Sequence, residues 1–276
     1  MSAESIEIEN LKYRYQDGTT ALKGLALSIP LKQRTVFLGA NGSGKSTLLR
    51  HLNGLLIPQE GSITIGGKSL NRKTADEIRK SVGLLFDNPD NQIFSPTVET
   101  DVSFGPTNLR MHKDEIARRT CAAMDATDIT HLKDRSPYNL SLGQKKRCAI
   151  AGVLAMTPEI LLMDEPFSGL DPVSLRQFLK TLDTMYAEGM TQIMSTHDVD
   201  IAYEWAENIV VLCAGEILAV GDRTLMHDEE LMTRAGLAVP LLPRIFEGFA
   251  RIPRNVFEAR EILQSLRKGG VSDAYT

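Results

Sequence analysis

Short apolar runs separated by amphipathic segments recur along this chain. Runs typical of buried strands are TVFLG (35–39), VGLLF (82–86), EILLMDE (159–165) and QIMST (192–196). Helical spacing follows in KSTLLRHLNGL, in 97–127, near Ser141, in 172–188 and in 198–206. In the 97–127 segment, Ile116, Thr120 and Met124 share one face. Because strands that alternate with helices usually form a parallel sheet covered by helices, the pattern predicts an α/β protein.

The two ends of the chain depart from this alternation. IEIENLKYRY and LALSI predict a small antiparallel sheet, SITIGG a further strand, and IVVLCAGEILAV a hairpin. Thr74 and Glu77 have capping-box spacing, which predicts a short helix in TADEIRK. After about Asp222 the chain becomes proline-punctuated, and FEAREILQSLRK brings together Phe257, Ile262, Leu263 and Leu266 on one helical face. The spacing alone leaves open whether this helix packs on its own chain or on a second copy.

Composition narrows the function. The 276 residues are 42% hydrophobic and 24% charged, as in ordinary globular proteins. The net charge of -4 lacks the basic excess of a nucleic-acid binder, so we expect no nucleic-acid partner. Cys121, Cys148 and Cys213 are far apart, which favours free thiols. Neither a signal peptide nor an apolar run of about 20 residues is present, so we expect a cytosolic chain that meets a membrane only through partners.

Residues 39–47, GANGSGKST, fit the phosphate-loop pattern between a strand and a helix. Gly39, Gly42 and Gly44 let backbone N–H groups turn toward phosphates at a helix N-terminus. We expect Lys45 to reach the β- and γ-phosphates of ATP and Ser46 to ligate Mg²⁺. The other loop residues predicted to bind ATP are Asn41, Ser43 and Thr47.

ILLMDEP provides a second part of the site. Asp164, at the end of an apolar strand, is suited to the Mg²⁺ shell, and Glu165 to orient an attacking water or accept its proton. Farther along, Ser141, Gly143 and Gln144 begin an amphipathic helix. Physical chemistry leaves two interpretations of Ser141 open: an anion site that completes the ATP site of a second subunit, or a simple N-cap.

GANGSGKST, LSLGQKKR, LLMDEPFSGLD and STHD together resemble the ATPase subunit of ABC transporters, over about residues 4–225. The resemblance implies a P-loop ABC ATPase fold: a RecA-like parallel core, an N-terminal antiparallel subdomain, and a helical signature subdomain at about 88–157. The domain would span 4–240, and 241–276 would form a helical appendage that contacts the other subunit.

The resemblance also implies roles for residues. A head-to-tail homodimer would enclose two ATPs, with Ser141, Gly143 and Gln144 of one subunit capping the other's nucleotide. Tyr15 would stack on adenine, His197 would contact the γ-phosphate, and Asp171 would link the two sites.

Two positions depart from the family pattern. Leu142 stands where the family has glycine. Asp87 stands where the family has the glutamine that senses Mg²⁺ and the attacking water, so Asp87 is our candidate for both the catalytic and the metal-binding role. Gln92 is a nearby candidate whose spacing does not match.

FDNPDNQIFSPTVETDVSFGPTNL and KKRCAIAGVLAM most resemble the ATPases of energy-coupling-factor importers, and PLLPRIFEGF recurs in their cobalt and nickel branch. The resemblance implies a transmembrane T subunit that docks by the loop of residues 87–104, a separate substrate-binding membrane subunit, and a location on the cytoplasmic face of the membrane. Ile93 and Phe94 would wall the docking groove or, alternatively, enter this chain's own core. Other readings are a vitamin importer, such as one for biotin, and a soluble ABC ATPase.

Overall fold

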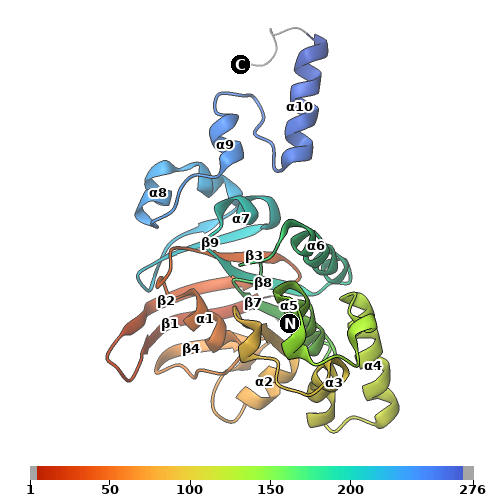
Figure 1. Ribbon diagram of the computed structural model, residues 1–276. Helices are drawn as coiled ribbons and strands as arrows, with labels where there is room; N and C mark the ends of the chain where they lie inside the picture. Colours follow the sequence, from red (N-terminus) through yellow and green to blue (C-terminus); the bar gives the residue numbers. More distant parts are fainter. Residues whose placement is uncertain (1–4, 270–276) are drawn as a thin grey trace.

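The protein is described here by a computed structural model of residues 5–269, and it contains two β-sheets. Residue 4 and residues 270–276, at the ends of the two predicted domain ranges, lie outside the described residues. The two sheets face each other, and helices cover the outer side of the larger one (Figure 1). This arrangement confirms the predicted α/β class and the antiparallel N-terminal sheet.

The larger sheet forms the centre of the molecule. Its strands, in spatial order, are β10 (Glu216–Gly221), β9 (Asn208–Cys213), β3 (Arg34–Leu38), β8 (Thr191–Thr196), β7 (Ile160–Asp164) and β6 (Val82–Leu85). All pairs are parallel except β10 with β9. Because both faces are covered in the middle of the sheet, β6, β7 and β8 are buried along their whole length without alternation. The carboxyl ends of β3, β7 and β8 therefore meet at one edge, where α/β proteins bind ligands.

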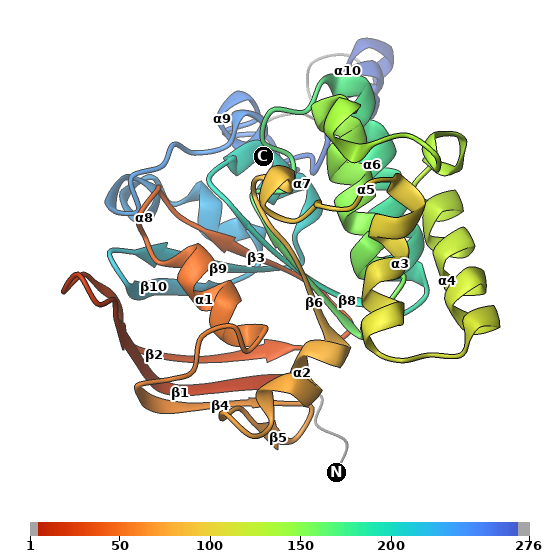
Figure 2. The ribbon, with the colours of Figure 1, turned by 60° about the horizontal axis from the view of Figure 1, so that its bottom comes forward.

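The smaller sheet is antiparallel and covers one face of the first. Its order is β2 (Thr20–Pro30), β1 (Ser5–Arg14), β4 (Glu60–Ile65) and β5 (Lys68–Ser69). Helix α1 (Lys45–Leu52) lies between the two sheets (Figure 2). Its side chains Leu48, Leu49 and Leu52 are fully buried in the core that the sheets share. The phosphate loop before α1 is thus held between two rigid layers.

The other face of the central sheet carries most of the helices. They are α3 (Val98–Asn108), α4 (Lys113–Ala126), α5 (Leu142–Leu154), α6 (Pro172–Ala187) and α7 (Val199–Trp205). Helices α3, α4 and α5 pack on one another beside the sheet (Figure 2). A second hydrophobic core, which includes Val102, Ile150 and Phe178, lies beneath these helices.

The helical pattern predicted over 97–127 is two helices. Helix α3 ends at Asn108 and α4 begins at Lys113. Pro106 is accommodated inside α3, and the break follows it, at Arg110, whose left-handed φ of 55° ends the helical path before α4. Thr120 and Met124 are nevertheless buried on the predicted face of α4.

The predicted capping box at Thr74 is wrong, although α2 (Ala75–Ser81) follows it. Thr74 has helical dihedrals, and its hydroxyl donates to the Ser69 carbonyl and accepts from the Asn71 N–H. The Glu77 side chain pairs with Lys68 instead of returning to the cap. The turn before the helix therefore uses Thr74, and Glu77 joins α2 to β5.

The C-terminal part is small and helical. It contains the 3-10 helix η4 (Arg223–His227), α8 (Glu229–Arg234), α9 (Leu241–Ile245) and α10 (Val256–Gly269), and α10 projects from the body (Figure 1). Phe257 is 80% exposed and Leu263 is half exposed, so the predicted apolar face is not buried on the described part of its own chain. Within residues 5–269, no helix is both long enough and apolar enough to span a bilayer.

Candidate nucleotide site

The phosphate loop between β3 and α1 has the backbone that its glycines predict. Gly42 and Gly44 have φ values of 81° and 106°, which favour glycine. A Cβ on Gly39 would lie 2.3 Å from the Leu212 carbonyl oxygen, so the loop packs tightly on β9. Asn41 is exposed beside this turn. The remaining loop residues with buried side chains are Ser43, Lys45 and Thr47.

Lys45 bends back over the loop. Its Nζ donates to the carbonyls of Gly39 at 2.7 Å and Ala40 at 3.1 Å, and it lies 3.8 Å from Oε1 of Glu165. Burial lowers the pKa of Lys45, an effect opposed by the negative charges of Glu165 and Asp164. The Lys45 ammonium therefore links the phosphate loop to Glu165, which follows the end of β7.

Asp164 ends β7 beside the phosphate helix. Its Oδ1 accepts from the hydroxyls of Ser46 at 3.0 Å and Ser195 at 2.5 Å, and the residue is 5% exposed. The groups that meet here are hydroxyl and carboxylate oxygens, the hard donors that Mg²⁺ prefers. The donor set of Ser46 and Asp164 therefore fits a magnesium ion, with Ser195 orienting the carboxylate.

Glu165 continues the chain in a left-handed conformation, with φ of 43°. Its N–H donates to the carbonyl and the hydroxyl oxygen of Ser195, at 3.1 and 3.2 Å. Its carboxylate accepts from Thr196 Oγ1 at 3.3 Å and lies 2.9 Å from Nδ1 of His197. The unusual φ turns the side chain away from Asp164 and toward the end of β8.

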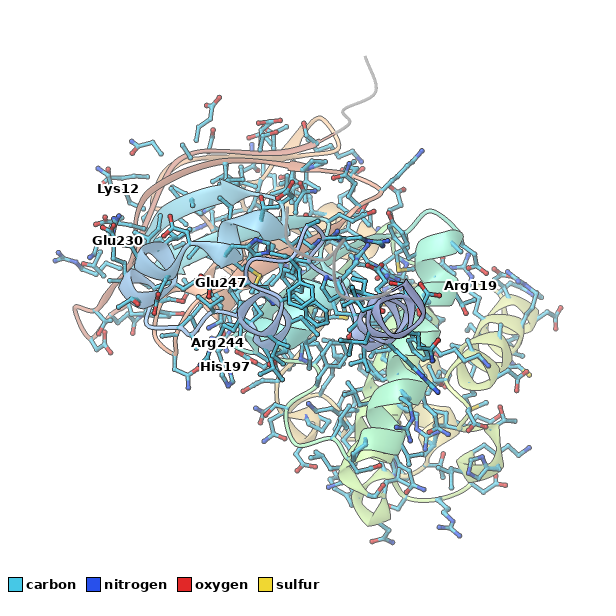
Figure 3. All side chains as sticks on the ribbon, turned by 90° about the horizontal axis from the view of Figure 1, so that it is seen from above. Lys12, Arg119, His197, Glu230, Arg244 and Glu247 are labelled. Atoms are coloured by element: carbon cyan, nitrogen blue, oxygen red, sulfur yellow. The ribbon has the colours of Figure 1, made fainter. Side chains whose placement is uncertain are left out.

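His197 is exposed at this edge. Viewed from the end that carries α10, Lys12 and Arg119 mark opposite sides of the molecule, and His197 lies between them at the margin (Figure 3). The imidazole side chain is 54% accessible, so both a nucleotide and a second subunit have access to it.

Tyr15 also lies near the phosphate helix. Its hydroxyl is 2.9 Å from Thr47 Oγ1, and its ring packs edge-on against Tyr13, with 5.1 Å between centroids. This places an aromatic ring beside α1, and its contact with adenine stays a prediction.

The start of α5 lies apart from this cluster, on the other side of the central sheet from α1 (Figure 2). Ser141 and Gln144 form a reciprocal capping box, so the N-cap interpretation is correct, and the exposed Ser141 leaves the anion interpretation open. A Cβ on Gly143 would lie 2.5 Å from Ser174 Oγ, so Gly143 is also required for packing on α6. Leu142, 42% exposed, lies against Gly169.

Asp171 is exposed at the start of α6, where its Oδ1 accepts from the N–H groups of Val173 and Ser174. Hydrogen bonds from Ser174 lower the pKa of this carboxyl group. Asp171 is therefore an N-cap with a surface position, next to the segment 168–170.

The loop after β6 corrects two predictions. Gln92 does not face the site, because its side chain accepts from the Phe86 N–H at 3.0 Å and donates to the Leu84 carbonyl at 3.2 Å. Ile93 is 2% exposed and belongs to the chain's own core. Asp87 is exposed, and its negative charge acts on Lys146.

Phe94 and Phe104 form an apolar groove with their neighbours. They are 53% and 44% exposed, and their rings meet edge-to-face at 4.6 Å. The groove has a volume of about 620 Å³, and its other apolar lining residues include Leu55, Phe86, Leu109 and Met156. Asp101 accepts from the Phe94 and Ser95 N–H groups and so holds the rim in place.

Sequence reasoning missed two residues. Ser195 orients Asp164, and the buried Lys146 donates to the carbonyls of Glu165, Pro166 and Ser168. Both lie inside motifs already noted, STHD and LSLGQKKR, but only long-range contacts reveal their roles.

The fold and this cluster define an ATP-binding cassette ATPase. A family model described as ABC transporter matches residues 22–168. A dimeric ATP-binding cassette solved in a post-hydrolysis state with ADP and Pi aligns at a TM-score of 0.72 and 27% identity, over 79% of this chain and 98% of that chain.

More similar relatives narrow the class. An energy-coupling factor transporter ATP-binding protein of Carboxydothermus hydrogenoformans is 49% identical over 94% of this chain and 97% of its own length. One of Methanocaldococcus jannaschii is 43% identical over 88% of each chain. The structure of cbiO1 from Clostridium perfringens, part of the ABC transporter complex cbiONQ, aligns at a TM-score of 0.74 and 43% identity, over 87% of this chain and 96% of that chain. This chain belongs to the ABC transporter family and, within it, to the energy-coupling factor transporter ATP-binding proteins.

Proposed function

We propose that this ATPase acts as a homodimer that drives uptake of cobalt or nickel ions through membrane partner subunits. The observation that carries the hydrolytic part is the convergence of Lys45, Ser46, Asp164, Glu165 and His197 at one edge of the central sheet. Helix α5, which Ser141 caps, lies on the other side of that sheet from α1 (Figure 2), which supports a site that a second subunit completes.

In the proposed reaction, Glu165 accepts a proton from a water whose oxygen attacks the γ-phosphorus in line. The bond to the bridging oxygen breaks, and ADP and inorganic phosphate leave. Lys45 binds the phosphate oxygens, and His197 contacts the γ-phosphate. Mg²⁺, held by Ser46 and Asp164, would supply charge neutralisation on the phosphates.

The second subunit completes each site in this proposal. Ser141, Gly143 and Gln144 lie at an exposed helix N-terminus, which attracts anions. Asp171 lies on an exposed turn near that helix, as a residue at a dimer interface should. The exposed apolar residues of α9 and α10, Leu241, Ile245, Phe257 and Leu263, suggest a further dimer contact.

The groove at Phe94 and Phe104 is the proposed docking site for a transmembrane subunit. Exposed aromatic pairs in a concave apolar surface mark interaction sites in otherwise polar surfaces. Lys80 lines the same groove and suits a partner segment with acidic or carbonyl groups, whereas Arg79 already pairs with Asp76 and the Gly54 carbonyl. The segment from Asp87 to Phe94 joins the end of β6 to this groove, so in this proposal it would carry the effect of docking toward the nucleotide site.

The metal substrate is proposed from the likeness of the 86–109 and 240–249 segments to the cobalt and nickel branch. Membrane vesicles that carry the complete transporter test it, by uptake of labelled Co²⁺, Ni²⁺ or biotin with parental or Glu165→Gln subunits. We expect ATP-dependent metal uptake that Glu165→Gln abolishes. Biotin uptake without metal uptake would contradict the substrate, and a chain that purifies without any membrane subunit would contradict the importer role.

A further inference from the structure

Lys146 makes three hydrogen bonds in the interior of the protein. It projects from α5 and is 1% exposed. Its Nζ donates to the carbonyl oxygens of Glu165 at 3.3 Å, Pro166 at 2.8 Å and Ser168 at 2.8 Å. An ammonium has three N–H donors, so this one is fully used by a single segment, residues 165–168.

The stability of the fold does not explain a charge at this position. Burial lowers the pKa of Lys146 to about 8, against the opposing effects of the Asp87 and Glu165 charges. Buried charges are costly, and an apolar side chain of similar volume is often at least as stable. Methionine would fill the same space without the desolvation cost of a charge, but it would leave the carbonyls of residues 165–168 without this donor. What Lys146 supplies is therefore a set of directed hydrogen bonds to one segment, which points to a positional role.

The held segment contains the proposed general base. Glu165 has a left-handed φ, which the chain keeps only if its surroundings enforce it. On one side, Ser195 of β8 accepts from the Glu165 N–H. On the other side, Lys146 of α5 donates to the Glu165 carbonyl. The main chain of this residue is therefore fixed from two elements that are distant in sequence.

We propose that Lys146 is a positioning residue, which holds Glu165 in its catalytic orientation and ties it to the start of α5 in the same subunit. Gln144 lies only two residues before Lys146, at the end of α5 that would face a partner's nucleotide. A movement of that end would therefore also move Glu165, the proposed general base of the subunit's own site. The inference rests on the proposed role of Glu165 and concerns how that carboxylate is placed.

The test compares variants of the full-length protein in steady-state hydrolysis of Mg-ATP. For Lys146→Met we expect kcat to fall about 10- to 100-fold, because a small displacement of a catalytic group has effects of that size. KM for ATP should stay within about twofold, since the phosphate loop is untouched. The midpoint of thermal unfolding is measured on the same variants, because methionine removes the desolvation cost of the charge and also the donor of three hydrogen bonds. Lys146→Gln retains an N–H donor and should recover part of kcat.

Lys145→Met is the matched control. It removes the neighbouring lysine of the same helix, whose ammonium pairs with Asp90 at 2.7 Å and donates to no carbonyl of 165–168. We expect kcat within about twofold of the parent. An equal loss in Lys145→Met would overturn the proposal, because the charge of α5 alone would then matter.

Two further results would overturn it: parental kcat in Lys146→Met, or a loss of kcat that is accompanied by lower stability and is not rescued by Lys146→Gln. Glu165→Gln, measured in parallel, separates the two hypotheses. If Glu165→Gln is inactive while Lys146→Met is fully active, only the positioning role fails. If Glu165→Gln hydrolyses ATP normally, the proposed role of Glu165 as base fails, and the positioning role with it.

Discussion

Nδ1 of His197 lies 2.9 Å from Oε1 of Glu165, so the ends of two neighbouring parallel strands place an imidazole against the carboxylate that we propose as base. The same oxygen lies 3.8 Å from the Lys45 ammonium. One carboxylate therefore contacts groups from the phosphate loop and from β8. This shared contact is the basis for the first prediction.

Glu165→Gln should bind ATP but stall hydrolysis, because an amide cannot accept the proton of the attacking water. We expect kcat to fall by about 100-fold or more, with nucleotide affinity unchanged. Without turnover, the ATP-bound dimer should accumulate and be visible by size-exclusion chromatography with Mg-ATP. Near-parental turnover would remove Glu165 from the role of base.

Asp87 should make the isolated protein a slow ATPase, because it places a negative charge where the resemblance to ABC ATPases implies the neutral amide of a glutamine. We expect Asp87→Gln to raise kcat about threefold or more and to change the Mg²⁺ dependence. Asp90→Asn removes an acid from the same loop and serves as control, since Asp90 pairs with Lys145. If turnover and Mg²⁺ dependence both stay as in the parent, Asp87 has no such role.

Ser195 should determine the affinity for magnesium through Asp164. Its hydroxyl is fully buried and donates to Oδ1, so Ser195→Ala leaves the carboxylate less well oriented. We expect the Mg²⁺ concentration for half-maximal hydrolysis to rise about tenfold. Ser62→Ala is a suitable control, because Ser62 also donates to a carboxylate, that of Glu9, but on the antiparallel sheet. Equal Mg²⁺ dependence in the two variants would refute the idea.

Two requirements should keep a side chain out of position 143: packing against α6 and the proposed contact with phosphate. Gly143→Ala places a methyl group against Ser174, and we expect a loss of about 1–3 kcal/mol in the free energy of unfolding. Ser174→Gly makes room, so the double variant should regain stability. If it regains ATPase activity as well, the role of Gly143 is packing alone, whereas activity that stays low supports a contact with nucleotide.

Because of Lys146, the free energy of unfolding should rise with pH in the alkaline range. Its pKa is about 8 in the folded protein and 10.5 when unperturbed, so the unfolded chain binds more protons between these values. The cost of burying the charge is fully present below about pH 8 and is relieved as pH rises toward 10.5. Denaturant unfolding should show the parent gaining stability over Lys146→Met in this range. If the free energy of unfolding changes with pH in the same way in the parent and in Lys146→Met, the lowered pKa of Lys146 is contradicted.

Local patterns were sufficient for the parts of the site that a single segment makes. The phosphate loop, the acids at the end of β7 and the strand–helix alternation follow from residue spacing, because backbone geometry links near neighbours directly. The division of 97–127 into two helices was missed, since the pattern of apolar residues continues through the break at Arg110.

The sequence by itself thus determined which chemistry this protein carries, whereas the tertiary structure decided how it is held. Ile93 lies in the core and Phe94 in the groove, although they are adjacent. The Gln92 side chain accepts a hydrogen bond from the Phe86 N–H at the end of β6, and Lys146 donates to the carbonyl of Pro166, about twenty residues away. The physical reason is that hydrogen-bond partners and burial are set by elements that meet only after folding, and no local spacing encodes which elements those are.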